Sequence, residues 1–339
     1  PGGCCGRREI HSGSETIPGP GPEVDIIAGE TLQIYFLGTS GALPTISRNL
    51  PCILLKWGSH DLIFDCGEGA QRQMMKARAG FSPEVIYISH WHADHFLGVI
   101  GLLQTMSFNG REQPLTIVGP DCVHEMVDDI KGLCRTRLGF PVESQKVRAG
   151  DLLIYEGYSI RVFGADHGIP GVGYIFEENM RPGRFNRERA IELGIRPGPL
   201  FGKLQRGSPV TITVDDEERV ITPEMVMGPL RPGRKVIYTG DTRPVLSELA
   251  DIGDDADLLI HDATFDHQEE ERAKEFMHAT AAEAGMVAHT LKAHRLALFH
   301  FSTRYTSADT HVSDAKTHFS GEILAPDDLT VFDIPFRNE

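Results

Sequence analysis

The sequence lacks the features of a membrane-spanning, disulfide-stabilised or nucleic-acid-coating protein. No apolar run approaches about 18 residues, so we expect no membrane-spanning helix and predict a cytoplasmic protein with no membrane partner. Six cysteines among 339 residues, none in a C-x-x-C pair, are too few for a disulfide framework and predict a reduced, mostly buried set. With 33 Lys and Arg against 48 Asp and Glu, the net charge of −15 argues against nonspecific coating of nucleic acid.

The residues that are present indicate a layered α/β domain. Hydrophobic residues make up 40% of the chain, and 339 residues suffice to bury a substantial core. Apolar, β-branched runs such as LQIYFLG (32–38) and KVIYTGD (235–241) alternate with helical stretches. Predicted hairpins mixed with βα units favour mixed sheets over a purely parallel one. We predict a domain over residues 31–339 and, from its glycine and proline content, a flexible leader over residues 1–30.

One segment, residues 178–208, breaks this pattern. It is polar, rich in glycine and proline, and offers few side chains for a core. Between Arg181 and Arg206, seven basic residues stand against two glutamates, a balance of +5 in a chain of net charge −15. Such clusters are usually solvated surface loops, but this contrast in sign favours contact with a polyanion. We therefore predict that the segment projects from the body and binds a polyanion.

The strongest chemical signal is the sequence HWHADH at residues 90–95, directly after a predicted strand. Because alternate side chains of an extended chain point the same way, His90 and His92 can hold one ion. Asp94 and His95 follow as the chain turns into a helix and can reach a second ion. Nitrogen and oxygen donors without thiolate suit Zn²⁺, and Mn²⁺ and Fe²⁺ accept the same donors. Isolated histidines are usually ordinary core or surface residues, but the density of ligand types here argues against that reading.

Further ligand types stand where three other predicted strands end. His167 follows RVFGAD, Asp241 follows KVIYTG, and His300 follows ALF. Each of these alone is typical of a turn or cap. Together with residues 90–95 they supply the donors for two ions that share one bridging carboxylate.

With these motifs in view, the chain resembles the metallo-β-lactamase superfamily, whose signature joins H-x-H-x-D-H, a later histidine, G-D-T and a final histidine. More narrowly, it resembles the short form of the tRNase Z family, endonucleases that remove 3′ trailers from precursor tRNA. The stretches that carry this resemblance include FLGTSGALPT (36–45), FDCGEGAQRQM (64–74), HDATF (261–265) and HFSTRY (300–305). The basic stretch RPGPLFGKLQRG (196–207) matches the projecting arm of that family.

The resemblance implies a fold, a cofactor and partners. The fold would be a four-layer αββα sandwich of the metallo-β-lactamase type with the arm inserted and two Zn²⁺ ions at one edge of its sheets. The partners would be precursor tRNA and a second copy of the chain, since one subunit's arm would clamp tRNA bound to the other. Hydrolysis by metal-activated water would leave a 3′-hydroxyl on the tRNA and a 5′-phosphate on the trailer.

The resemblance also implies which residues hold the metal ions and which bind the tRNA. The ligands would be His90, His92 and His167 for one ion, Asp94, His95 and His300 for the other, and Asp241 as the bridge. The contacts with the tRNA backbone would come from Arg184, Arg187, Arg189, Lys203 and Arg206 of the arm, and from Arg48 in the loop PTISRN (44–49).

The catalytic roles follow from the same resemblance. Asp94 would orient or deprotonate the attacking water in addition to binding metal. His278 and Asp262 would transfer a proton to the leaving oxygen. Many members of the family have Glu where this chain has Asp262, so the carboxylate is retained on a shorter side chain.

Two other functions compete with this one. A phosphodiesterase or other small-substrate hydrolase of the same fold would have no need of the basic segment. A metal-stabilised nucleic-acid-binding protein without catalysis would need neither His278 nor Asp262. Deleting residues 181–206 separates the first alternative from the nuclease, and Asp94→Ala, which should abolish cutting but not binding, separates the second.

Overall fold

The computed structural model describes residues 30–133, 137–214 and 216–337. The predicted leader therefore lies outside the described residues, apart from Glu30. The described chain divides into a body, residues up to Arg181 and from Leu230 onward, and a smaller unit over Pro182–Pro229, called the insert below. Within the described residues, no helix combines the length and apolar character needed to cross a membrane.

The first sheet of the body is mixed. Its strands lie in the order β16-β1-β2-β3-β4-β5-β6, antiparallel as far as β3 and parallel from β3 onward. The strands are β1 (Leu32–Gly38), β2 (Cys52–Trp57), β3 (His60–Phe64), β4 (Val85–Tyr87), β5 (Leu115–Gly119), β6 (Val142–Lys146) and β16 (Thr330–Asp333). The hairpin β2–β3 is short because Gly58 supplies a left-handed residue at its turn, with a φ of 55°.

The second sheet is also mixed. Its order is β15-β14-β13-β12-β9-β8-β7, parallel as far as β12 and antiparallel beyond it. The strands are β7 (Leu152–Ile154), β8 (Tyr158–Asp166), β9 (Pro170–Glu178), β12 (Lys235–Tyr238), β13 (Leu258–Asp262), β14 (Arg295–Phe299) and β15 (Glu322–Leu324). Mixed sheets in both layers confirm what the combination of hairpins and βα units predicted.

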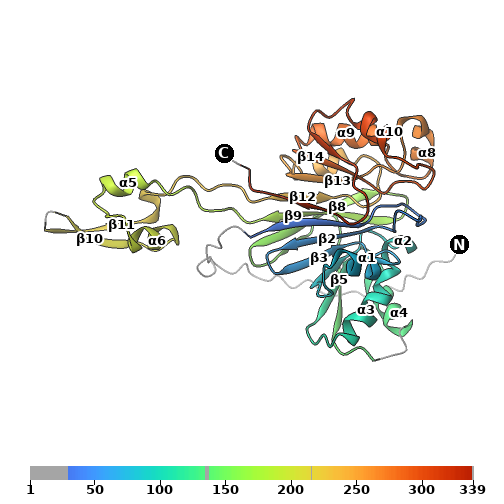
Figure 1. Ribbon diagram of the computed structural model, residues 1–339, viewed down its shortest axis with the longest axis horizontal. Coiled ribbons are helices and arrows are strands. Elements are labelled where there is room, and N and C mark those ends of the chain that lie inside the picture. Colours follow the sequence, from blue (N-terminus) through green and yellow to red (C-terminus); the bar gives the residue numbers. More distant parts are fainter. Residues whose placement is uncertain (1–29, 134–136, 215, 338–339) are drawn as a thin grey trace, which may run out of the picture. The chain divides into compact units, whose positions relative to one another are not determined.

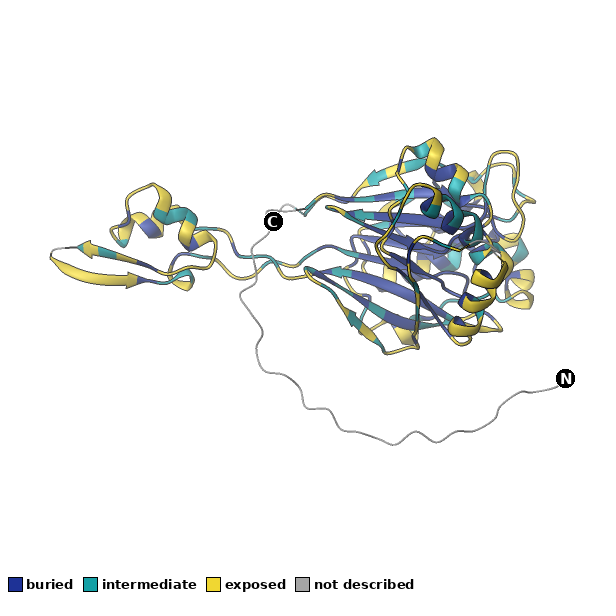
Figure 2. Cartoon of the chain, turned by 90° about the horizontal axis from the view of Figure 1, so that it is seen from below, coloured by how far each residue is buried: buried dark blue, intermediate teal, exposed yellow. Residues whose placement is uncertain are grey.

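The two sheets face each other across one apolar core, and helices cover their outer faces (Figure 1). Buried side chains of both sheets meet in this core, among them Phe36, Phe64, Tyr174 and Tyr238. The first sheet is covered by α1 (Ala70–Ala77), α2 (Ala93–Phe96), α3 (Gly98–Phe108) and α4 (Val123–Leu133). The second is accompanied by α7 (Leu246–Leu249), η2 (His267–Glu269), α8 (Glu270–Glu275), α9 (Ala281–Thr290) and α10 (Asp309–Ala315). The body is thus the predicted αββα sandwich, with its buried residues concentrated in the sheets (Figure 2).

The insert has secondary structure and a small core of its own. Its elements are α5 (Arg187–Glu192), α6 (Pro199–Gln205), β10 (Val210–Val214), β11 (Glu217–Ile221) and η1 (Pro223–Met225). The prediction placed it at residues 178–208, but the compact unit continues to Pro229. The reason is that the antiparallel pair β10–β11 contributes Val210 and Ile221, which pack with Ala190 and Leu204.

The cysteines match the predicted buried set only in part. Cys52 and Cys66 are buried and unbridged. Cys122 is exposed, because it precedes α4 in a turn and has a left-handed φ of 69° rather than lying in a strand. The remaining three cysteines fall outside the described residues.

A buried ion pair joins the two sheets. The guanidinium of Arg234 donates to both carboxylate oxygens of Glu178 at 2.9 and 3.0 Å, and to the carbonyl oxygen of Ile334 beyond the first sheet at 2.9 Å. Trp57 on β2 donates to the same carboxylate at 3.0 Å. Arg234 and Glu178 are 3% and 8% exposed, so removing either charge leaves the other buried without an opposite charge beside it.

We expect Arg234→Ala to lower the free energy of unfolding by about 3–5 kcal/mol, because Glu178 would stay buried and uncompensated. Urea denaturation of the full chain measures the loss. The matched control is Arg295→Ala, since the pair of Arg295 with Glu322 at 2.8 Å is largely exposed. Such surface pairs contribute less than about 1 kcal/mol. Equal losses in the two variants would contradict the assigned role of the buried pair.

Candidate metal centre

All seven predicted metal ligands come together where strands of both sheets end. Residues 90–95 follow β4 of the first sheet, and His167 directly follows β8 of the second. Asp241 comes shortly after β12, and His300 directly after β14. Their donor atoms form overlapping groups in which every pair of atoms lies within 4.8 Å. Strand ends from two facing sheets therefore build one site from four distant parts of the chain.

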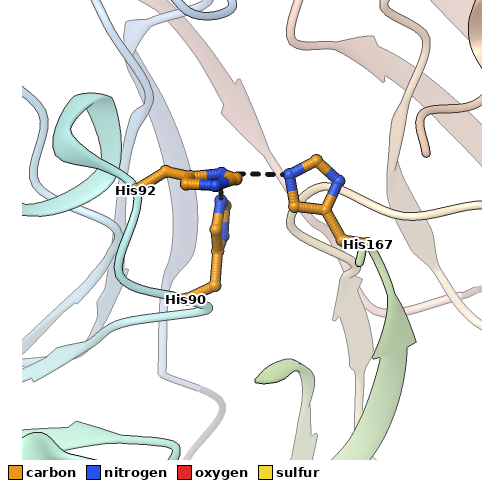
Figure 3. A group of neighbouring side chains, drawn as sticks. All are labelled: His90, His92 and His167. Atoms are coloured by element: carbon orange, nitrogen blue, oxygen red, sulfur yellow. Dashed lines mark hydrogen bonds between the residues drawn. The ribbon is translucent and has the colours of Figure 1, made fainter. Parts of the chain in front are cut away.

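Three imidazoles form the first group, and their nitrogens point at one another (Figure 3). His92 Nδ1 lies 2.9 Å from His90 Nε2 and 3.1 Å from His167 Nε2. Burial, with neighbouring imidazoles, lowers the pKa of His90 well below its ordinary value and also lowers the pKa of His92. Neutral imidazoles present lone pairs, which is the form that binds a metal ion.

The second group is built around two carboxylates. Asp94 Oδ2 lies 3.5 Å from His95 Nε2 and 3.6 Å from His300 Nε2. Asp241 Oδ2 lies 3.1 Å from His95 Nε2 and 3.2 Å from His300 Nε2. The same oxygen is 3.7 Å from the nearest nitrogens of His90 and of His167 in the first group. Asp241 is therefore shared by both groups, as a bridging ligand must be.

The site fits a bound metal better than it fits a hydrogen-bonded protein interior. Asp241 Oδ1 and His300 Nε2 are fully buried, yet neither has a hydrogen-bond partner among the described residues. Buried polar atoms are nearly always satisfied, so such orphaned atoms need a partner that the chain itself does not supply. Imidazole nitrogens and carboxylate oxygens without thiolate are the donors that divalent ions such as Zn²⁺ accept.

Comparison with known proteins agrees with this geometry. The family described as "Beta-lactamase superfamily domain" matches residues 205–301, and "Anti-Pycsar protein Apyc1" matches residues 32–136. The ribonuclease Z of Methanosarcina acetivorans is 45% identical over 310 residues, which cover 91% of this chain and 100% of that protein. The ribonuclease Z of Myxococcus xanthus is 42% identical, with 91% and 99% covered. The chain belongs to the ribonuclease Z family.

A solved structure supports the same assignment for the fold. The human short-form tRNase Z has a TM-score of 0.64 and 27% identity, and the match covers 90% of this chain and 100% of that one. Both the resemblance predicted from the motifs and the metallo-β-lactamase fold are thereby confirmed.

Other groups of the protein contact three of the candidate metal-binding imidazoles on the ring nitrogen that faces away from the centre. His95 Nδ1 lies 2.7 Å from the Asp65 carboxylate, and His167 Nδ1 lies 2.8 Å from the carbonyl oxygen of Met277. His300 Nδ1 lies 2.8 Å from Thr264 Oγ1. Partners of this kind fix the tautomer and leave Nε2 as the donor to the metal.

The sequence analysis missed Asp65, the carboxylate behind His95. It is fully buried and accepts from the Ser89 amide and hydroxyl, both at 2.7 Å, and from the Tyr238 hydroxyl at 2.6 Å. Its φ of 54° is left-handed, which is a strained backbone conformation. The three hydrogen bonds just described, together with the contact with His95 Nδ1, offset that strain. The signal that could have found it is its position one residue after β3, where the rule of polar residues at strand ends applies again.

His278 and Asp262 lie together at the edge of the metal centre. His278 Nδ1 is 2.8 Å from Asp262 Oδ2, so the shorter carboxylate reaches the histidine. The His278 ring lies 4.7 Å from the ring of His167 and 5.0 Å from that of His300. Burial alone lowers the pKa of His278, but the adjacent Asp262 carboxylate outweighs burial and raises it to about 9. His278 is therefore a cation at neutral pH.

The predicted tRNA-binding residues occupy two separate parts of the chain. All five on the insert are exposed, namely Arg184, Arg187, Arg189, Lys203 and Arg206. Arg48 lies in the body, where its guanidinium donates to Asp327 and to the Pro326 carbonyl oxygen and lies over the Phe301 ring. The contact of Arg48 with a substrate phosphate stays a prediction. The contacts just described for its guanidinium are with other residues of the body.

Proposed function

We propose that this chain is a phosphodiester hydrolase that removes 3′ trailers from precursor tRNA. The observation that carries the proposal is the set of seven strand-end donors, converged beside a charged His278, in a chain that aligns with the whole length of a ribonuclease Z.

The proposed cofactor is a pair of divalent cations, with Zn²⁺ the best match to the donors. The proposed ligands are His90, His92 and His167 for one ion, Asp94, His95 and His300 for the other, and Asp241 for both. When bound, such ions supply a hydroxide at neutral pH and neutralise charge that develops on the phosphate oxygens.

Asp94 is the proposed acceptor for the attacking water. Burial raises its pKa, but the neighbouring imidazoles of His300 and His95 outweigh that effect, so the pKa lies below its usual range. The carboxylate is therefore ionised at any working pH. Its side chain is 13% exposed, whereas that of Asp241 is 3% exposed, so Asp94 is the carboxylate of the site that solvent can reach.

His278 is the proposed general acid. Asp262 binds its Nδ1, which leaves Nε2 as the nitrogen that can donate a proton. Attack of water on phosphorus breaks the bond to the 3′ oxygen of the tRNA, and protonation of that oxygen yields the 3′-hydroxyl. The trailer then carries the 5′-phosphate. Because His278 enters this step already charged, no earlier protonation is required.

We further propose that the insert binds the tRNA backbone and that the enzyme acts as a cytoplasmic homodimer, with one subunit's insert holding tRNA bound to the other. Support for the first point is the cluster of exposed basic residues between Arg184 and Arg206, rather than the net charge of the insert, whose seven basic residues are matched by seven acidic ones. Contacts with phosphate position an RNA without reading its sequence, which suits an enzyme that accepts many tRNAs.

The test is incubation of the purified chain with a 3′-extended precursor tRNA, followed by mapping of both product ends. We expect a 3′-hydroxyl tRNA and a 5′-phosphate trailer, and complete loss of cleavage in excess chelator with recovery on adding Zn²⁺ or Mn²⁺. Cleavage that persists in chelator, or products with a cyclic phosphate, would refute the proposal, because a cyclic phosphate requires attack by the RNA's own 2′-hydroxyl.

A further inference from the structure

The backbone between β1 and β2 rests directly on two of the proposed metal ligands. The Ala42 amide donates to Asp94 Oδ2 at 2.9 Å. The neighbouring Gly41 amide donates to the carbonyl oxygen of Phe301 at 2.9 Å, next to His300. A Cβ at Gly41 would lie only 2.5 Å from the His300 ring, so the backbone packs against that imidazole. Any shift of this loop, residues 39–49, must therefore move Asp94 or His300.

Hydrogen bonds within the loop close its ends on each other, since the Ser40 amide donates to the carbonyl oxygen of Asn49 at 2.9 Å, but the loop also needs contacts with the rest of the body. Ala42 has a left-handed φ of 59°, which a residue with a Cβ adopts only when its surroundings impose it. Leu43 and Ile46 are 64% and 109% exposed, so the middle of the loop contributes little to a core. Apart from the contacts of Gly41 and Ala42, the side-chain contacts that fix the loop to the body are therefore sought at its two ends.

One carboxylate, that of Asp328, holds both ends. Its Oδ1 accepts from the Thr39 hydroxyl at 2.9 Å, at the start of the loop. Its Oδ2 accepts from the Asn49 amide at 2.6 Å, at the end of the loop, and from Gln73 Nε2 on α1 at 2.7 Å. Asp328 is fixed in turn by the Leu329 amide, which donates to the carbonyl oxygen of Phe36 on β1 at 2.6 Å.

A second set of contacts, made by Arg48, joins the loop to the same turn, residues 326–328. Arg48 Nη2 donates to Asp327 at 2.7 Å, and Arg48 Nη1 donates to the Pro326 carbonyl oxygen at 2.8 Å and to the Thr39 hydroxyl at 2.5 Å. Asp327 is 85% exposed, so this ion pair contributes little stability. Asp328 differs from Arg48 in that its carboxylate joins both ends of the loop to α1, since it accepts from Thr39, Asn49 and Gln73.

We propose that Asp328 is a positioning residue of the metal centre. It touches no metal ligand, but it clamps loop 39–49 against Asp94 and His300 and thereby sets the affinity of the ion that these two residues share with His95. The inference rests on the proposed function only for its effect on catalysis; the effect on metal affinity stands without any RNA. Residues that orient metal ligands change affinity or activity by about 10–100-fold when removed.

The decisive experiment is stepwise titration of the metal-stripped full chain with Zn²⁺ in competition with a chromophoric chelator. Asp328→Asn keeps the shape of the side chain but replaces one accepting oxygen by a donor, so at least one tie is lost. We expect one of two Zn²⁺ equivalents to weaken by about 10–100-fold and the other to stay within about threefold. With precursor tRNA, kcat should fall by a comparable factor while KM stays unchanged.

The matched control is Asp333→Asn on β16, the strand that follows Asp328, because that carboxylate is exposed and accepts from the half-buried Gln33 amide at 2.7 Å. Both equivalents should bind to this variant as to the parent. If Asp328→Asn is too unstable to purify, Thr39→Val compared with Arg48→Gln decides. The Thr39 hydroxyl donates to Asp328 and accepts from Arg48, so weakening of one equivalent in Thr39→Val but not in Arg48→Gln belongs to Asp328. Unchanged binding of both equivalents, or equal weakening of both, would overturn the proposal.

Discussion

Replacing the insert, Pro182–Pro229, by a short Gly-Ser linker is expected to lower kcat/KM for precursor tRNA by at least about 100-fold while hydrolysis of a small nitrophenyl phosphodiester stays within about twofold. The reason is that the insert supplies phosphate contacts, each of which contributes a salt-sensitive increment of affinity for RNA but nothing for a small ester. The replacement is compatible with the body, because Arg181 and Arg231 already pair through their backbones at 2.7 and 2.8 Å.

A charge-only variant separates loss of charge from loss of structure. Arg187, Lys203 and Arg206 are exposed, and their replacement by Gln removes three charges from the surface of the insert. We expect a weaker dependence of RNA affinity on salt concentration, with unchanged turnover of the small ester. If precursor tRNA is processed normally without the insert, the alternative of a small-substrate phosphodiesterase gains and the assigned role of the insert is wrong.

His278→Ala is expected to lower kcat for precursor tRNA by about 10²–10⁴-fold, the usual contribution of a general acid. The pH profile gives the more specific signature. Since the Asp262 carboxylate raises the pKa of His278 to about 9, its proton is present at lower pH and is lost above that value. The activity of the unsubstituted enzyme should therefore fall about tenfold per pH unit at pH values above the pKa of His278. This decrease at high pH, the basic limb of the profile, should be absent in His278→Ala.

Asp262→Asn tests the same pair from the other side. Without the carboxylate, burial dominates and lowers the pKa of His278, so the basic limb should move well below about 9. The control is His318→Ala, an exposed histidine on the surface of the body, which should leave the limb in place. A basic limb that survives unchanged in His278→Ala would show that another group donates the proton.

The ligand set was largely predictable because it follows a local rule. A strand that ends at the edge of a sheet delivers the next residue to that edge, so His167 and His300 could be recognised from the strands before them. The close spacing within residues 90–95 required no knowledge of the fold. For these positions the chemistry lies in a few consecutive residues, and the structure then brought together what the pattern had indicated.

Other parts of the site depend on which strands become neighbours, and that is not local information. Asp65 reaches His95 and Tyr238 only because β3 adjoins β4 in one sheet and faces β12 in the other. Asp328 meets Thr39 across 289 positions of sequence because β16 pairs with β1. A single aspartate carries no motif that distinguishes these roles from that of an ordinary surface residue.

The extent of the insert was underestimated for a related reason. Charge and the content of glycine and proline delimited residues 178–208, but these properties describe exposed surface rather than packing. The strands β10 and β11 that follow are less basic, yet they complete the small core with Val210 and Ile221. Composition thus located the segment, whereas its boundary depended on contacts between consecutive elements.

Elemental analysis of the active enzyme tests most directly whether residues from both sheets bind two cations, on which the proposed cleavage of precursor tRNA depends. The account predicts two equivalents of transition metal per active protomer in the parent, and fewer than two with proportionate loss of cleavage in Asp241→Ala, which removes the shared ligand. A protomer that cleaves precursor tRNA at the full rate with one equivalent or none would contradict the account.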